Sequence, residues 1–238
     1  MSPKNTAPFR CSSVPVQAAG SATRSKPAVP ADDSHHIHGV RDLLLLVVIP
    51  DFPYPILKFL GLPFPQIRLA HVAVYLYSES EGVSHLLEWG LYHPTRRREG
   101  AVRSYRLGAP QFDAEGNLCV SSLADLCQTI SGLEKRLPLR GSVWQLDPGA
   151  ARPAVEIAKA WAKRPPRYHF RDCSCKTFGE LVLASIGDIS GFSGRPWIRS
   201  WQGSADAPSF EYDPRHRQLK WTLSPAHPQL IRSRPTVG

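Results

Sequence analysis

The sequence predicts an α+β fold in which an antiparallel sheet packs against helices. Residues 69–77 and 83–89 show the two-residue alternation of strands, and the short turn between them predicts a hairpin. Residues 174–186 instead repeat apolar side chains at helical spacing. The 23 prolines among 238 residues are about double the ordinary share of proline. This proline content argues against a long helical bundle or a coiled coil.

The other strand predictions rest on apolar runs and on the residues that bound them. Residues 43–49 form an apolar run rich in branched side chains, and Pro50 follows it directly. This pattern predicts a buried strand that stops at the proline. Further strands are expected at 102–107 and 142–146, and residues 51–65 are expected to form a loop with a helical turn at 56–60.

Three helices are predicted from helical spacing and from the residues at their ends. Residues 122–133 place their leucines, a cysteine and an isoleucine on one face. The segment 153–163 begins with proline, which suits the first turn of a helix. Gly187 is expected to end the helix over 174–186. Residues 197–221 are expected to be irregular, with one hairpin.

The chain is expected to hold one folded domain between two flexible ends. Residues 1–38 are rich in proline, serine and alanine, and have no acidic residue before Asp32. This composition predicts a disordered basic tail. Such a start also resembles an organelle transit peptide, although a flexible tail is the simpler interpretation. The folded domain is expected over 39–223, and a second flexible tail over 224–238.

The cysteines and the apolar runs bear on the location of the protein. Five cysteines are an odd number, and their irregular spacing indicates no disulfide framework. A reducing intracellular compartment, in the first place the cytoplasm, is the simpler expectation. The longest apolar run, 43–49, is far shorter than the roughly twenty residues that cross a bilayer as a helix. The cysteines are Cys11, Cys119, Cys127, Cys173 and Cys175.

The net charge of +9 favours anionic partners but does not identify a fold. The arginine run 96–98 is expected to be a solvated loop that could contribute to a basic face for phosphate or anionic lipid. A basic membrane-surface protein is therefore one alternative, and it predicts salt-sensitive binding to anionic vesicles that survives loss of Cys175. No zinc-finger, helix-turn-helix or RNA-binding signature is present, so specific nucleic-acid binding is not expected.

The sequence predicts no metal site and no cofactor. Cys173 and Cys175 are separated by one residue, but a structural zinc site needs four ligands and no second cysteine pair exists. His35, His36 and His38 form a cluster in the predicted tail, where such a cluster is more often incidental.

The segment 168–178 gives the strongest indication of chemistry. It places Cys175 on the first turn of a predicted amphipathic helix, where the helix dipole lowers the pKa of a thiol. A cysteine nucleophile also needs a base within hydrogen-bond reach, usually a histidine. His71, at the head of the strand 69–77, is the best candidate. Either residue alone is more simply explained as part of a buried core.

Taken together, these segments resemble the circularly permuted papain-like thiol hydrolases. That group includes the lecithin:retinol acyltransferase-like, NlpC/P60-like and PPPDE-like proteins, in which a strand histidine precedes a helix cysteine. Here a strand headed by His71 and then a second strand precede the motif at 174–178. Ser174 stands where the family has asparagine, and Thr177 where it frequently has histidine. The resemblance covers residues 69–187 and implies a permuted papain-like fold, with an antiparallel sheet packed against the cysteine helix.

The resemblance also implies a third polar residue that orients His71. In the acyltransferase-like branch it is a histidine on the next strand, a place that His85 could fill. In the PPPDE-like branch the second strand carries a glutamate–aromatic element, which the segment from Glu88 to Gly90 resembles. His85 and Glu88 are three residues apart, so a regular strand turns only one of them toward the site. We favour His85 on the sequence.

The activity implied by the resemblance is that of a cysteine-dependent hydrolase or acyltransferase. His71 would take the proton of Cys175, and the thiolate would attack an amide, isopeptide or ester carbonyl to form a thioester. The implied substrates are peptides, ubiquitin-like conjugates or acyl lipids. The main alternative is a catalytically inactive relative that serves as a protein- or anionic-lipid-binding module.

Overall fold

The computed structural model describes most of the predicted domain. The predictions for the tails 1–38 and 224–238, the helical turn at 56–60 and the arginine run 96–98 lie outside the described residues. The described residues are 42–53, 68–92, 100–169, 173–187, 192–193, 200–201 and 207–222.

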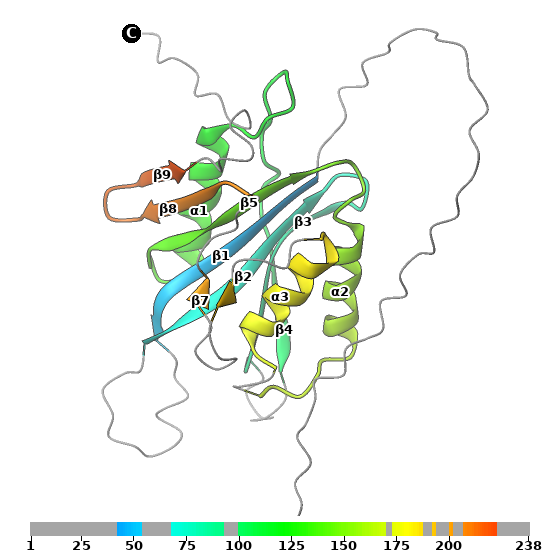
Figure 1. Ribbon diagram of the computed structural model, residues 1–238. Helices are drawn as coiled ribbons and strands as arrows, with labels where there is room; N and C mark the ends of the chain where they lie inside the picture. Colours follow the sequence, from blue (N-terminus) through cyan, green and yellow to red (C-terminus); the bar gives the residue numbers. More distant parts are fainter. Residues whose placement is uncertain are drawn as a thin grey trace, which may run out of the picture.

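In the described part of the chain, seven antiparallel strands form one sheet in the order β4-β3-β2-β1-β5-β8-β9 (Figure 1). The strands β2 and β3 pair as the predicted hairpin, and β8 and β9 pair as a second one. A separate two-stranded sheet joins β6 (Phe192–Ser193) to β7 (Ser200–Trp201). The strands of the large sheet are β1 (Asp42–Pro53), β2 (Arg68–Ser78), β3 (Val83–Gly90), β4 (Ala101–Arg106), β5 (Leu139–Leu146), β8 (Ser209–Asp213) and β9 (Gln218–Thr222).

Helices cover both faces of this sheet. The helices α2 (Arg152–Lys163) and α3 (Cys175–Ser185) lie side by side on one face, and α1 (Val120–Leu133) lies on the other (Figure 1). The central strand β1 therefore has both faces buried: Leu44 packs toward α2 and α3, and Leu45 toward α1. This double burial explains why the strand is a continuous apolar run rather than an alternating one. The predicted α+β class is confirmed.

The expectation that Pro50 stops the first strand is wrong. β1 continues to Pro53, and its pairing with β2 shifts register between Ile49 and Phe52. A proline has no N–H to donate to a sheet, and strands tolerate it at bulges. Because Pro50 lies within this irregularity, the strand passes it and continues beside the start of β2.

The described helices include none that is long and apolar enough to cross a membrane.

The predicted end of α3 is confirmed at Gly187, which adopts a positive φ of 87°. The N–H of Gly187 donates to the carbonyl of Ala184 at 3.2 Å, as at helix C-termini that end with a glycine in the left-handed conformation. The helix that carries the predicted nucleophile is thus bounded at both ends by local sequence signals.

Candidate active site

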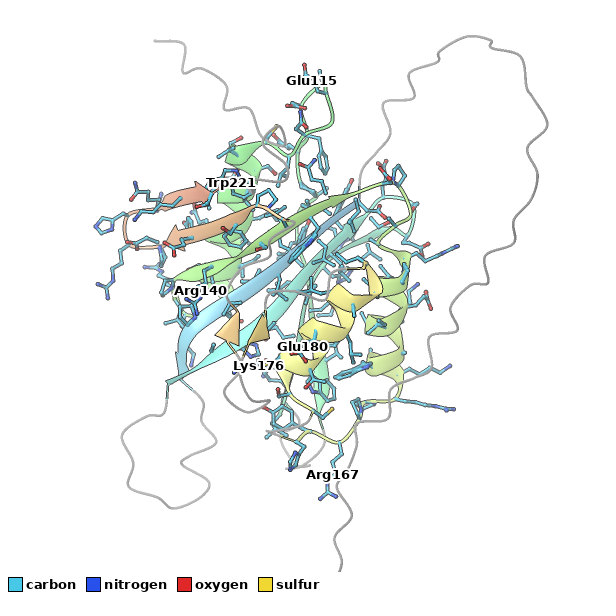
Figure 2. The ribbon with its side chains drawn as sticks, viewed as in Figure 1. Glu115, Arg140, Arg167, Lys176, Glu180 and Trp221 are labelled. Carbon is cyan, nitrogen blue, oxygen red and sulfur yellow. The ribbon has the colours of Figure 1, made fainter. Side chains whose placement is uncertain are left out.

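Cys175 is the first residue of α3, and capping interactions hold it there. Ser174 is the N-cap residue and forms a capping box with Thr177, whose Oγ1 accepts a hydrogen bond from the Ser174 N–H at 3.3 Å. Lys176, labelled in Figure 2, directly follows Cys175 and marks this end of the helix. Ser174 and Thr177 thus fix the start of the helix that presents the cysteine.

His71 lies near the start of β2 and is in contact with Cys175. Burial by itself lowers the pKa of a histidine. The negative charge of Cys175, a hydrogen bond between the two side chains and the carboxylate of Glu88 oppose this effect and raise the pKa of His71 to about 10. These interactions favour the imidazolium form of His71 beside the sulfur. The structure brings the predicted nucleophile and the predicted base together.

Glu88 and Tyr92 lie behind the histidine. Oε2 of Glu88 is 3.8 Å from Nε2 of His71, which is an ion-pair distance rather than a hydrogen bond. The Tyr92 hydroxyl donates to the same Oε2 at 2.8 Å and lies 3.2 Å from Nε2 of His71. Because its own proton goes to Glu88, the Tyr92 oxygen accepts the Nε2–H of His71. Tyr92 thus joins the two charged groups.

His85 lies away from the Cys175–His71 pair, against strand β4. Its Nδ1 is 2.7 Å from Oγ of Ser104, in an exposed contact on the neighbouring strand β4. The structure therefore does not bring His85 to the Cys175–His71 pair, and it places Glu88, the alternative of the sequence argument, at that position instead.

The register of β2 against β3 explains why Glu88, and not His85, lies beside His71. Glu88 pairs with Ala73, and His85 pairs with Leu76. Ala73 belongs to the apolar cluster under α1, whereas Leu76 belongs to the cluster under α2 and α3. His71 is two residues from Ala73, so strand alternation turns His71 and Glu88 to the α1 face. His85 points to the opposite one. Cys175 belongs to the helix layer on that opposite face and meets His71 where α3 begins, close to the start of β2.

A second glutamate completes the group. Burial raises the pKa of Glu134, and a hydrogen bond to Glu88 together with the charge of Glu88 raises it further, to about 8. Burial also acts to raise the pKa of Glu88, but His71, Glu134 and Tyr92 lower it to about 2. The sequence argument missed Tyr92 and Glu134. Tyr92 lies four residues after Glu88, but no pattern in the chain connects Glu134 with β3.

Comparison with known proteins gives a likeness in fold. The solved structure of the type VI secretion system effector TseH is similar to this chain, with a TM-score of 0.57 and 21% sequence identity. The match covers 77% of this chain and 99% of TseH. It supports the papain-like class of the fold that the sequence predicts. No protein-family model matches the sequence, and no curated protein matches it either.

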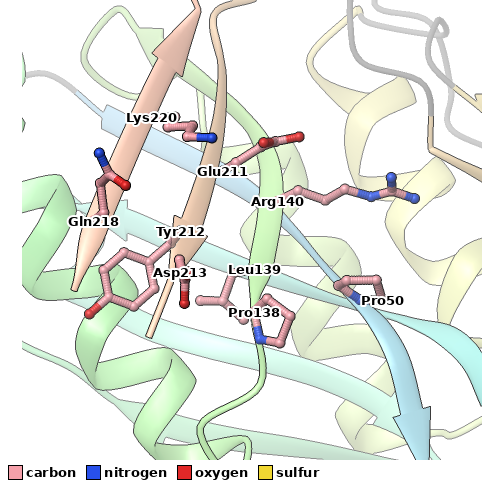
Figure 3. A pocket seen from close by; sticks show the side chains of 9 residues that line it. All are labelled: Pro50, Pro138, Leu139, Arg140, Glu211, Tyr212, Asp213, Gln218 and Lys220. Carbon is pink, nitrogen blue, oxygen red and sulfur yellow. The ribbon is translucent and has the colours of Figure 1, made fainter. Parts of the chain in front are cut away.

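Two other features of the described residues bear on the site. No group of three or more histidine, cysteine, aspartate or glutamate side chains among them could hold a metal ion. A cavity of about 360 Å³ opens across β5, β8 and β9, where Arg140, Glu211 and Lys220 line it (Figure 3). Neither His71 nor Cys175 lines this cavity, so it does not mark the position of the thiol.

The geometry predicts different results for the two candidates for the third residue. We expect Glu88→Gln to slow acylation of the protein by p-nitrophenyl acetate about a hundredfold, because His71 loses its charged partner. We expect His85→Ala to leave the rate within about twofold, because only an exposed hydrogen bond to Ser104 is lost. Stopped-flow absorbance of the released nitrophenolate measures both rates. A large loss in His85→Ala with none in Glu88→Gln would contradict this assignment.

Proposed function

We propose that the protein is a cysteine-dependent hydrolase or acyltransferase that acts on an amide, isopeptide or ester bond through a thioester. Cys175 is the nucleophile, His71 is the base and Glu88 orients the histidine. The observation that carries the proposal is the hydrogen-bonded contact of buried His71 with Cys175 at the first position of α3. The likeness in fold to TseH supports it.

The proposed resting state is a thiolate beside an imidazolium. The partial positive charge of a helix N-terminus stabilises a thiolate, and so does a neighbouring protonated histidine. Because the folded-state pKa of His71 lies above its ordinary value of 6.5, protonation of this histidine stabilises the folded protein fully below pH 6.5. The contribution is lost as the pH rises through about 10.

The proposed reaction proceeds in two acyl transfers. The Cys175 thiolate adds to the substrate carbonyl carbon, and the negative charge that develops on the carbonyl oxygen is stabilised by backbone N–H groups at the start of α3. The carbon–leaving-group bond breaks as the imidazolium of His71 donates its proton to the amine or alcohol that departs. His71, now neutral, takes a proton from water or from another acceptor as that acceptor attacks the thioester carbon. The carbon–sulfur bond breaks, the acyl group leaves on the acceptor, and the thiolate–imidazolium pair is restored.

The order of the residues agrees with a permuted papain-like arrangement, which is part of the proposal. The base lies on β2 and the nucleophile follows it on α3, with β3, β4, α1, β5 and α2 between them in the chain. The proposed substrates are peptides, ubiquitin-like conjugates or acyl lipids, because each offers a carbonyl that a thiolate attacks.

A second candidate function is a binding module that keeps the fold without turnover. The burial of the pair favours it, since Cys175 is 3% exposed and His71 is 1% exposed. A substrate carbonyl has to approach the sulfur within about 3.5 Å for reaction. The thiol of an inactive relative would instead be as unreactive as a core cysteine.

The test that separates the two functions is alkylation of each cysteine by iodoacetamide, followed by mass spectrometry from pH 5 to pH 10. We expect Cys175 to react at pH 6 at least about tenfold faster than any other cysteine, since a thiolate is the reactive form. The variant His71→Ala is expected to remove this advantage. Cys127 is the internal control, because burial raises the pKa of its thiol. Equal, slow alkylation of Cys175 and Cys127 would support the binding module.

A further inference from the structure

The two oxygens of the Glu88 carboxylate have different surroundings. Oε2 accepts the Tyr92 hydroxyl and faces His71. Oε1 is buried and has no hydrogen-bond donor among the described residues. A buried carboxylate oxygen without a donor is costly, because it has lost its hydrogen bonds to water. Oε1 therefore requires a proton donor close by.

Glu134 supplies the group that reaches Glu88. It is the C-cap residue of α1 and is 6% exposed. Its carboxyl lies close enough to that of Glu88 for a hydrogen bond, and two carboxyl groups can share one only if one of them keeps a proton. Glu88 faces the imidazolium of His71 and accepts from Tyr92, both of which favour its charged form. The proton therefore resides on Glu134.

The turn after Glu134 is built to hold it in this place. Lys135 and Arg136 follow with φ values of 56° and 57°, a region that side chains other than glycine rarely adopt. The Arg136 N–H donates to the carbonyl of Ser131 at 2.7 Å, and the hydroxyl of Ser131 donates to the carbonyl of Leu137 at 2.7 Å. Two successive left-handed residues are an energetic cost that the surrounding hydrogen bonds must offset. They fix the end of α1 that carries Glu134.

We propose that Glu134 is a positioning residue that keeps its carboxyl protonated and donates a hydrogen bond to Oε1 of Glu88, so that Oε2 stays against Tyr92 and His71. The inference rests on the proposed function in one respect, because the histidine that it positions is the proposed base. The shared proton lets a charged glutamate stand behind His71 without a second negative charge beside it.

The charged and titratable groups that face Glu134 set its pH range. Burial and Glu88 on β3 raise the pKa of Glu134 to about 8, while His71 on β2 and Arg103 on β4 oppose them. Tyr92 is also close, since the charge of Glu134 contributes to raising the pKa of its hydroxyl. Above pH 8 Glu134 loses its proton, and its carboxylate then repels that of Glu88. Oε1 of Glu88 then has no donor, so the carboxylate is no longer held in one orientation against Tyr92 and His71, and the reactivity of the thiol falls.

The first experiment measures the protonation of Glu134 directly and does not depend on enzymatic activity. Carbon-13 NMR of protein labelled at the glutamate side-chain carboxyl carbons follows each glutamate from pH 3 to pH 10. We expect one resonance to titrate near pH 8, and to be absent in Glu134→Gln but present in Glu115→Gln, an exposed control labelled in Figure 2. The same resonance is expected in Cys175→Ala. A Glu134 resonance that titrates near its ordinary value of 4.5 overturns the inference.

The second experiment measures alkylation of Cys175 by iodoacetamide against pH in the same variants. We expect the wild-type rate to decline through pH 8, and Glu134→Gln to move this decline upward, because its amide donates to Oε1 without ionising. Glu134→Ala is expected to react roughly tenfold more slowly at pH 7, the equivalent of one hydrogen bond to a charged group. A decline that Glu134→Gln leaves unchanged overturns the inference.

The two proposals fail in different ways. If Cys175 is unreactive in the wild type while Glu134 still titrates near pH 8, the proposed function fails and the shared proton stands. If Cys175 is reactive and Glu134 titrates as an ordinary glutamate, the proposed function stands and the positioning role of Glu134 fails.

Discussion

The variant Cys175→Ala is expected to lose the rapid acylation by p-nitrophenyl acetate almost entirely. Removal of the nucleophile from a catalytic group that acts as a unit lowers the rate by about 10⁴-fold or more. Residual release of nitrophenolate then comes from water or from exposed lysines. Stopped-flow absorbance gives the rate, and mass spectrometry of the intact protein and its peptides locates the acetyl group. We expect the acetyl group on Cys175 in the wild-type protein.

The matched control for this variant is Cys173→Ala. Cys173 is the rival nucleophile, since it lies two residues earlier and is also buried. It precedes α3, and its backbone forms a bridge with His169, in which the Cys173 N–H donates to the carbonyl of His169 at 2.8 Å. Because it is not on the helix, it does not have the helix N-terminus to stabilise its thiolate. Rapid acetylation of Cys173 with none at Cys175 would exclude the proposed nucleophile.

The contact between Cys175 and His71 could be anticipated because each residue lies at a position with a local signal. The cysteine begins an amphipathic helix, and the histidine heads an alternating strand. The same local signals account for the β2–β3 hairpin, for the three helices and for the stop at Gly187. These features depend on neighbours in the chain, which a sequence displays directly.

The choice of Glu88 over His85 could not be made in the same way. Alternation states only that the two residues point to opposite faces. Which face holds His71 depends on the register of β2 against β3, where Ala73 meets Glu88. It also depends on which helices cover each face. Glu134 is harder still to predict, because its position results from packing α1 against a strand far away in the chain.

The second large effect is expected on the stability of the fold, from a substitution at Gly141 in the middle of β5. This strand lies between β1 and β8, where Gly141 pairs with Val47 on one side and Phe210 on the other. A Cβ atom added at Gly141 would lie 1.8 Å from the carbonyl oxygen of Leu46 and 3.0 Å from the ring of Phe210. The oxygen belongs to the backbone of the central strand, so it cannot move aside without disturbing the β1–β5 ladder.

We therefore expect Gly141→Ala to lower the free energy of unfolding by about 3 kcal/mol, at the upper end of the cost of overpacking a core. Gly132→Ala is the matched control, because a Cβ there meets no atom within 4 Å and the residue lies in α1. Alanine is favoured over glycine inside a helix, so this variant is expected to gain about 0.5–1 kcal/mol. Urea unfolding followed by circular dichroism measures both changes. Equal stability of Gly141→Ala and the wild type would mean that β5 does not approach Leu46 as closely as the structure has it, and the order of strands around β1 would have to be revised.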